Sequence, residues 1–461
     1  MCRPVRSLLA VATVAALAAI AAPEAHANGR PPLSVKVGFR PGNTTDIFLG
    51  VTFGLMVTKD DAVTWRWICE SAVGFQGTFD PDYELASDGT LWASTFDGLR
   101  YTRDGCNWSP VGPPLGTWLV TAVTVGPDGT IWAGAADPVL GSGIFKSADN
   151  GQSFQAAGNL NQTFDWFDTL EIAPSDVNRV YVTGYRVQAG QPRQKLLFRS
   201  MDAGQTWESL PVVAFAGTDL SDVQIASINP TNPEQVFVRV TFTAQTIEEE
   251  VYRTDNWSRS LAQGGPTWTK VLDLPTYIQA VVARRNGDVV VATQSMGLHR
   301  STDGGSTFVP IPGVTFEARC LVERPSDQSL WMCANHLPPD SMGLGRSMDA
   351  SMGSWVTKIR YEEMLGPVRC EPGNNQHDDC EVNLWCGLKD QFGVTSNELD
   401  CSGDADVDGP PGPPPKEGCC SGSAAPGAEV GIGVIGVALL GLKRREKRGK
   451  GKGKGKGKAG C

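Results

Sequence analysis

One short pattern recurs along this chain: Ser or Thr, any residue, Asp, any residue, Gly, any residue, Thr or Ser, then Trp or Phe. Its seven copies begin at Ser147, Ser200 and Ser301, which match in full, and at Thr58, Thr102, Thr254 and Ser347, which are degenerate. Consecutive copies start 44 to 54 residues apart. That period is the length of one four-stranded propeller blade, so the repeat restricts the fold strongly.

The segments beside each copy are typical of short strands. Thr130–Gly134 and Gly143–Ser147, for example, are β-rich runs interrupted by Gly and Asp, and no long segment has a helical period. We predict an all-β fold, a seven-bladed β-propeller of four-stranded blades over residues 31–362. Blade 1 is complete from Ser34 and blade 7 ends near Ile359, which leaves no strand for exchange between the ends. We therefore expect the ring to close by packing of blade 1 against blade 7.

The repeat resembles the Asp-box, or BNR, repeat of a family that includes sialidases, sortilin-type receptors, photosystem assembly factors and some xyloglucanases. The resemblance covers the whole predicted propeller. It implies that each copy forms the turn between the third and fourth strands of a blade, where the Asp accepts backbone N–H bonds, the Gly allows a positive φ and the aromatic residue packs between blades. The Asp residues are then structural rather than catalytic. They are Asp60, Asp104, Asp149, Asp202, Asp255, Asp303 and Asp349.

Residues 1–27 are predicted to be a signal peptide. Arg3 and Arg6 give a positive start, Leu8–Ala22 is almost wholly apolar, and Ala25-His26-Ala27 fits a signal peptidase site. The apolar run is too short and too rich in Ala for a good membrane span. We therefore expect the chain to be exported.

The C-terminal end is predicted to be a sorting or anchor segment. An acidic and Pro-rich linker covers residues 402–417, and Cys419 and Cys420 open a segment, 418–461, with a short apolar stretch and a basic tail. This order resembles the MYXO-CTERM sorting signal, which implies recognition by a membrane sorting protease and attachment through the Cys motif. The alternative is an ordinary C-terminal membrane anchor. Either prediction places the propeller at the outer face of a bacterial cell, bound to the outer membrane or released outside.

The cysteines fit export, because even-numbered groups in an exported chain favour disulfides over metal ligands. Residues 368–401 are predicted to be a small Cys-rich module, too small to bury a core of its own. Its pairing cannot be deduced from the sequence. The disulfide candidates are Cys69, Cys106, Cys320, Cys333, Cys370, Cys380, Cys386 and Cys401.

Composition excludes some partners and cofactors. Removal of both predicted processing segments would leave 28 Lys and Arg against 47 Asp and Glu, so we expect no binding to nucleic acid. Neither the Cys spacing nor the four His predicts a metal centre, and we expect no cofactor. Asp404–Gly409 matches the first half of a calcium loop, but Pro415 stands at the twelfth position, which favours a solvated acidic linker.

Ligands of such propellers meet the face opposite the repeated turns, by this resemblance. The connections expected on that face combine aromatic residues with carboxylates, a mixture suited to sugars or peptides. Ordinary loop composition is the alternative. The candidate ligand-binding residues are Asp80, Asp82, Tyr83, Asp165, Trp166, Asp168, Asp219, Asp222, Tyr277 and Arg319.

These observations favour a cell-surface recognition or scaffolding module for an extracellular glycan or protein. The competing class is a secreted glycoside hydrolase, sialidase-like or xyloglucanase-like. A sialidase needs an Arg cluster and a Tyr nucleophile with a Glu partner, and no Tyr here can be assigned that role. Paired carboxylates remain open, because Asp and Glu abound in the loops. We predict no catalytic residue.

Overall fold

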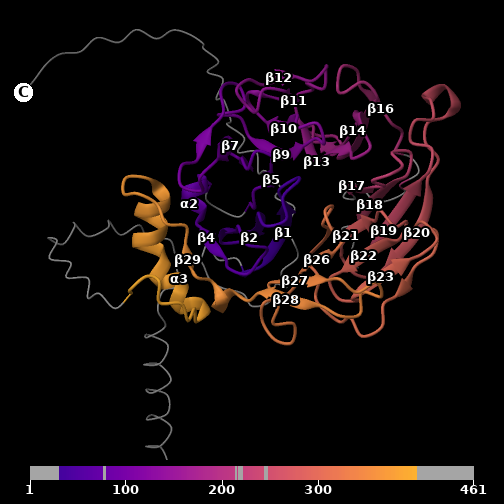
Figure 1. Cartoon of the computed structure of the whole chain (residues 1–461). Helices are drawn as coiled ribbons and strands as arrows, with labels where there is room; N and C mark the ends of the chain where they lie inside the picture. Colours follow the sequence, from indigo (N-terminus) through magenta and orange to yellow (C-terminus); the bar gives the residue numbers. More distant parts are fainter. Residues whose placement is uncertain (1–30, 76–78, 213–214, 216–221, 243–247, 402–461) are drawn as a thin grey trace, which may run out of the picture. The chain divides into compact units, whose positions relative to one another are not determined.

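The computed structural model describes residues 31–75, 79–212, 215, 222–242 and 248–401. Seven antiparallel sheets follow one another along these residues (Figure 1). The predicted seven-bladed β-propeller is confirmed. The segments predicted as a signal peptide, a Pro-rich linker with a calcium-loop-like sequence, and a sorting segment with Cys419 and Cys420 lie outside the described residues.

Each blade takes four consecutive strands of the chain. Blade 1 contains β1 (Ser34–Phe39), β2 (Ile47–Val51), β3 (Gly54–Thr58) and β4 (Arg66–Ile68). Blade 2 contains β5 (Tyr83–Leu85), β6 (Leu91–Thr95), β7 (Gly98–Thr102) and β8 (Ser109–Pro110). Blade 3 contains β9 (Val120–Val125), β10 (Ile131–Asp137), β11 (Gly141–Ser147) and β12 (Gln155–Ala156). Blade 4 contains β13 (Asp165–Ala173), β14 (Asp176–Arg186), β15 (Gln194–Ser200) and β16 (Glu208–Ser209).

Blade 5 contains β17 (Asp222–Ile228), β18 (Val236–Phe242), β19 (Glu248–Thr254) and β20 (Thr269–Leu274). Blade 6 contains β21 (Ile278–Ala283), β22 (Val289–Thr293), β23 (Leu298–Ser301) and β24 (Val309–Pro310). Blade 7 contains β25 (Cys320–Glu323), β26 (Leu330–Cys333), β27 (Leu344–Ser347) and β28 (Val356–Ile359). The short helix α2 (Glu70–Val73) connects blade 1 to blade 2, and the 3-10 turn Leu261–Gln263 lies within blade 5, between β19 and β20.

The first strand of each blade contacts the first strand of the next. These contacts run from β1 to β5, β9, β13, β17, β21 and β25, and then back to β1. The first strands therefore line the centre of the ring, as Figure 1 shows for β1, β5, β9 and β13. The second strands β2, β6 and β22 are buried at every position, because each lies inside its sheet and between neighbouring blades. Their sequences, such as Val289-Val-Val-Ala-Thr293, are rich in β-branched residues, which suit such a position.

The repeated motif forms the turn between the third and fourth strands. In blade 4, the carboxylate of Asp202 accepts bonds from the Ser200 hydroxyl at 2.8 Å, the Thr206 N–H at 2.8 Å and the Thr206 hydroxyl at 2.6 Å. Gly204 has a φ of 77° and lies against Trp132 of blade 3, and the Trp207 indole donates to Ala157 O of the same blade at 2.8 Å. The turn thus ties each blade to its neighbour. The same carboxylate role is filled by Asp60, Asp104, Asp149, Asp303 and Asp349.

Blade 5 departs from the prediction. Asp255 does not hold its turn; it pairs with Arg253 and accepts a bond from the Gln235 amide. Asn256 takes the carboxylate's place, accepting from the Thr254 hydroxyl and the Thr267 N–H at 2.9 Å each. The assignment of Asp255 as the motif residue is therefore wrong. The reason is position, since the holding group stands two residues after the Ser or Thr, and here that residue is Asn.

After blade 7 the chain crosses back to blade 1. The 3-10 turn Tyr361–Glu363 leads to β29 (Gly366–Pro367), which pairs in parallel with β4. A π-helical segment (Gln376–Leu384) and α3 (Trp385–Phe392) follow. We call residues 366–401 the strap. Packing of blade 1 on blade 7 is therefore only part of the closure, because the strap adds a fifth strand to blade 1.

Four disulfides join the predicted cysteines. They are Cys69–Cys380, Cys106–Cys370, Cys320–Cys333 and Cys386–Cys401. Cys320 and Cys333 are direct cross-strand partners on β25 and β26. Two cysteines of the strap form disulfides with the propeller, Cys380 with Cys69 next to blade 1 and Cys370 with Cys106 of blade 2. The other disulfide of the strap, Cys386–Cys401, lies within it.

The turn geometry makes a prediction about stability. Asp202→Ala removes three hydrogen bonds to a partly solvated carboxylate, so the free energy of unfolding should fall by about 1 kcal/mol. Asn256→Asp should change it by less than about 0.5 kcal/mol, because Asp is the residue that the other turns use. Urea unfolding of both variants checks this, and a larger loss for Asn256→Asp than for Asp202→Ala would contradict it.

Candidate functional site

The face opposite the repeated turns is formed by the connections between second and third strands and between blades; we call it the loop face. Four aromatic side chains follow one another across it. Phe79 stacks on Phe96 with ring centroids 4.2 Å apart, Phe96 meets the edge of Trp166 at 6.3 Å, and Trp166 stacks on Tyr185 at 6.0 Å with an interplanar angle of 10°. We call Phe79, Phe96, Trp166 and Tyr185 the aromatic row.

Local structure explains the positions in this row. Phe79 belongs to the connection from blade 1 to blade 2, and Phe96 stands in the turn between β6 and β7. Trp166 and Tyr185 are direct cross-strand partners on β13 and β14, the arrangement that brings side chains on one face of a sheet together. The guanidinium of Arg193 lies 3.5 Å from the centroid of the Tyr185 ring and ends the row with a cation–π contact.

Other apolar side chains in the connections of the loop face are exposed to solvent. Phe96 is 38% exposed and Phe164, which precedes β13 with a φ of 77°, is 53% exposed. Val139 and Leu140 in the turn between β10 and β11, and Val187 after β14, are also exposed. Apolar surface of this kind on the loops of three successive blades is typical of a binding surface.

A cluster of charged groups lies beside the end of the row. Asp168 stands at a bulge in the pairing of β13 with β14, which frees its side chain from the regular alternation. Burial, with the nearby Asp222 carboxylate, raises the pKa of Asp168 to about 7 against the opposing effect of Arg193 and Arg239. Asp222 forms an ion pair with Arg193 at 3.1 Å, and burial raises its pKa also. Two predicted candidates, Asp168 and Asp222, are thus brought together with Trp166.

Other candidates are held in separate contacts. Asp165 is buried and accepts two bonds from Arg186. Arg319 pairs with Glu317 on the connection to blade 7. Tyr277 is partly buried beside β21, where its carbonyl accepts a bond from Gln294, and Asp80 precedes blade 2 without joining the row. Asp219 lies outside the described residues.

Tyr83 is a core residue. Its side chain is 1% exposed and packs on Phe48 of blade 1, with ring centroids 6.1 Å apart. It alternates with Glu84 along β5, so the aromatic ring points between the blades while its neighbours face the ring centre. We therefore leave Tyr83 out of the ligand-binding surface.

The ring centre contains a second charged group, which holds the predicted candidate Asp82 away from the aromatic row. Lys36 of β1 donates to Asp82 at 2.5 Å and to Glu84 at 2.9 Å, and the Val123 N–H donates to the other Asp82 oxygen at 3.1 Å. Desolvation by the surrounding strands raises the pKa of Glu171 on β13, Glu84 adds to the shift and Lys36 opposes it, although the side chain remains exposed to solvent. Strands of four blades bring these groups together, so no spacing along the chain could have predicted this cluster.

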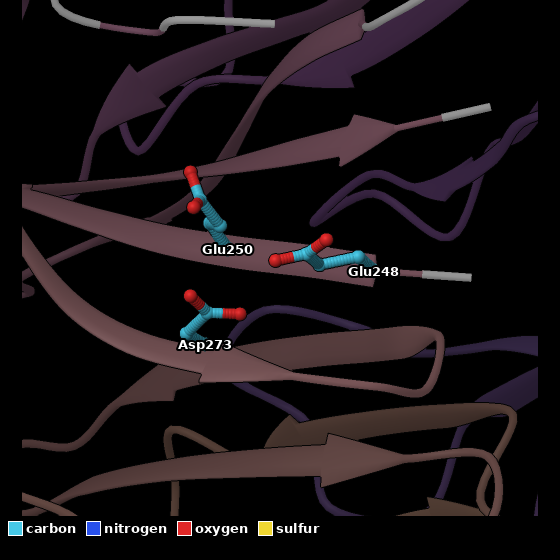
Figure 2. Close-up of side chains that lie close together, drawn as sticks. All are labelled: Glu248, Glu250 and Asp273. Carbon is cyan, nitrogen blue, oxygen red and sulfur yellow. The ribbon is translucent and has the colours of Figure 1, made fainter. Parts of the chain in front are cut away.

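Three carboxylates of blade 5 also approach one another. Oxygens of Glu248 and Glu250 on β19 and of Asp273 on β20 lie within 4.8 Å (Figure 2). The Lys270 ammonium binds Glu250 at 2.7 Å and Asp273 at 2.8 Å, and the Tyr252 hydroxyl donates to Glu250 at 2.7 Å. The lysine neutralises the pair where a cation would bind, and we assign no metal site there.

No family model matches the sequence. A curated protein of Paenibacillus sp named xyloglucanase is 23% identical over 181 residues, which cover 32% of this chain and 17% of that protein. The chain therefore matches less than a fifth of its curated relative's length.

Solved structures with a similar fold include the following three. They are the extracellular domain of the BT4673 one-component system of B. thetaiotaomicron (TM-score 0.47, 14% identity, 69% of this chain and 39% of that one), YCF48 of Cyanidioschyzon merolae (0.44, 14%, 65% and 92%) and an ancestral GH74 enzyme (0.33, 12%, 70% and 56%). Within the described residues, none of the helices has the length and apolarity to span a membrane.

The raised pKa of Asp168 predicts how stability depends on pH. A folded protein that keeps a proton on Asp168 up to about pH 7 loses stability as pH rises from about 4, where the unfolded chain already releases this proton, to about 7. Asp168→Asn should reduce that loss. Urea unfolding between pH 4 and 8 measures it, with Asp128→Asn on an exposed turn as control. An Asp168→Asn variant with the full wild-type pH dependence would contradict the assignment.

Proposed function

We propose that this chain is an exported, surface-attached β-propeller that binds an extracellular glycan on its loop face without cleaving it. The observation that carries the proposal is the aromatic row, which ends in the Arg193–Asp222 pair. Flat aromatic rings bind the apolar faces of sugar rings, and neighbouring charged groups bind their hydroxyls. A row that joins the loops of blade 2 to those of blade 4 suits an extended chain better than a single small molecule.

Membership of the Asp-box family is part of this proposal. It is supported by the motif itself and by the carboxylate that accepts bonds in six of the seven turns. Export is supported by the N-terminal sequence and by four disulfides, which persist in oxidising compartments. Surface attachment, through a sorting protease or as a plain membrane anchor, rests on the C-terminal sequence.

A neutral plant-type glucan is the first ligand class to examine. The matched curated protein is named a xyloglucanase, and its match covers only part of each chain. The aromatic row needs no charge on the ligand, whereas the two arginines beside it are already bonded, Arg193 to Asp222 and Arg239 to Gln224 and a backbone carbonyl. We therefore favour a neutral chain over an acidic one.

Glycoside hydrolysis is the second candidate. Its supporting observation is the pair Asp168 and Asp222, in which one carboxyl has a pKa of about 7 and the other is paired with a guanidinium. Two carboxyl groups with different proton affinities are what acid–base hydrolysis of a glycoside requires. Burial also raises the pKa of Asp222. The two carboxyl groups come from neighbouring blades, Asp168 from blade 4 and Asp222 from blade 5.

Binding is tested first. Trp166→Ala and Phe96→Ala should weaken binding of xyloglucan oligosaccharides by about tenfold or more, since each loses one stacked ring. Tyr277→Ala, on the loop face of blade 6 but outside the row, is the matched control. Isothermal calorimetry of the full chain, guided by a glycan array, measures the affinities. Equal affinity in all four proteins, or binding of a protein but no glycan, would refute the assignment.

Turnover separates the two candidates. We expect no release of reducing sugar from any glycan that binds, because the proposed site is a binding surface. If Asp168→Asn abolishes hydrolysis but binds the glycan normally, the protein is a hydrolase and the recognition proposal is wrong. Hydrolysis that survives in this variant would point to a contaminant.

A further inference from the structure

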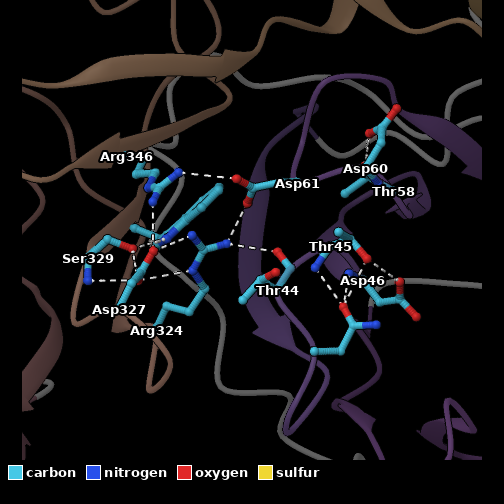
Figure 3. Close-up of polar contacts among 12 residues, drawn as sticks. Thr44, Thr45, Asp46, Thr58, Asp60, Asp61, Arg324, Asp327, Ser329 and Arg346 are labelled. Carbon is cyan, nitrogen blue, oxygen red and sulfur yellow. Dashed lines mark hydrogen bonds and ion pairs between the residues drawn. The ribbon is translucent and has the colours of Figure 1, made fainter.

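The ends of the ring meet at a cluster of charged side chains between blade 7 and blade 1 (Figure 3). Arg324, which follows β25 and is 2% exposed, forms a forked pair with Asp327 and also bonds Asp61 and Thr44 O of blade 1. Arg346 of β27 bridges the same two carboxylates, at 2.7 Å from Asp327 and 3.3 Å from Asp61. These bonds are non-covalent, so on their own they close the ring reversibly.

The strap lies across the same junction. Leu365 and Val368 donate to carbonyls of Trp65 and Trp67, on either side of the parallel pair of β29 with β4. Trp385 of α3 is 1% exposed and packs on Trp67, with ring centroids 6.2 Å apart. The Gln376 amide, also buried, donates to the Trp67 carbonyl at 3.0 Å. The strap is therefore part of the core of blade 1, although blade 7 precedes it in the chain.

Two disulfides make this contact covalent, and one encloses the other in sequence. Cys69, directly after β4, joins Cys380, and Cys106, in the turn that ends β7, joins Cys370. The residues that they join are 311 and 264 positions apart. All of blades 3 to 7 lie inside both covalent loops, and blade 2 lies inside the outer one.

We propose that the strap is a covalent latch, which keeps the ring closed and passes tension from the chain beyond Cys401 into blade 1. Cys386–Cys401 fastens the end of the strap to α3, and Cys69–Cys380 fastens the strap to blade 1. Force applied at the C-terminal side of Cys401 then runs through these disulfides and bypasses blades 2 to 7. The proposal does not depend on which ligand the loop face binds.

Cutting the chain tests the closure. A protease site placed between Val139 and Leu140, in the exposed turn of blade 3, lies inside both loops. After cleavage of the full chain, the two fragments should stay together in denaturant without reductant, and separate with it. They should also stay together in Cys69→Ser/Cys380→Ser and in Cys106→Ser/Cys370→Ser, because each variant keeps one bond.

A cut outside the loops is the matched control. A site at Gly42, in the turn between β1 and β2, precedes Cys69, so its N-terminal fragment should separate in denaturant without reductant. Separation of the fragments cut at Val139 in the unreduced wild type would overturn the latch. This readout uses denatured chains, so variants that fold poorly are still informative once oxidised.

Pulling the full chain from both ends tests the load path. With both disulfides intact, about 110 nm of chain, 311 residues at about 3.5 Å each, should stay hidden at any force that leaves disulfides whole. Loss of Cys69–Cys380 alone should release about 16 nm of it, because 264 residues remain enclosed. Reductant should release the rest. Release of the whole length from the oxidised wild type would show that the strap does not carry the load.

Discussion

The fold depends on the contact between its first and last sheets. Most neighbouring blades are also consecutive in the sequence, whereas blade 1 and blade 7 pack on each other from opposite ends of the propeller. The buried Arg324 joins these two blades through hydrogen bonds to Asp61 and to Thr44 O. Arg346 also binds the Asp61 carboxylate. Buried charges of this kind are costly unless every donor is satisfied, so the junction accepts only one register between the blades. Loss of that register would displace every loop on the face that we assign to binding.

The loop face takes its shape from the opposite face. Because the repeated turns fix each third and fourth strand against the blade before it, the connections at the other ends of the strands are free to differ. Blade 2 uses this freedom for Phe96, and blade 4 for the Trp166–Tyr185 pair and the bulge at Asp168. The residues that we propose for binding stand on irregular segments that a regular frame positions, and such segments can differ between proteins that share one architecture.

The repeat predicted the blades because its period is a local property of the chain. It failed at Asp255, where an insertion hides that Asn256 stands in the motif position. The disulfide pairing, the position of the strap and the Lys36–Glu171 group all depend on residues far apart in sequence. The spacing of residues along the chain does not show which blades lie next to one another, so these features could not be predicted. The mixture of aromatic residues and carboxylates in the loops selected Trp166, Asp168 and Asp222, which the structure brings together. The same rule selected Tyr83, whose position on β5 turns it into the core.

The outer strands of the blades determine how neighbouring copies of this protein can associate. β8, β12, β16 and β24 are two residues long, and β29 covers part of β4. The longer β20 carries Lys270 and Asp273, whose charges disfavour a neighbouring strand. A rim with such short or charged edges offers little backbone for another molecule to extend its sheet. Many copies packed side by side would therefore remain separate rather than join into fibrous aggregates.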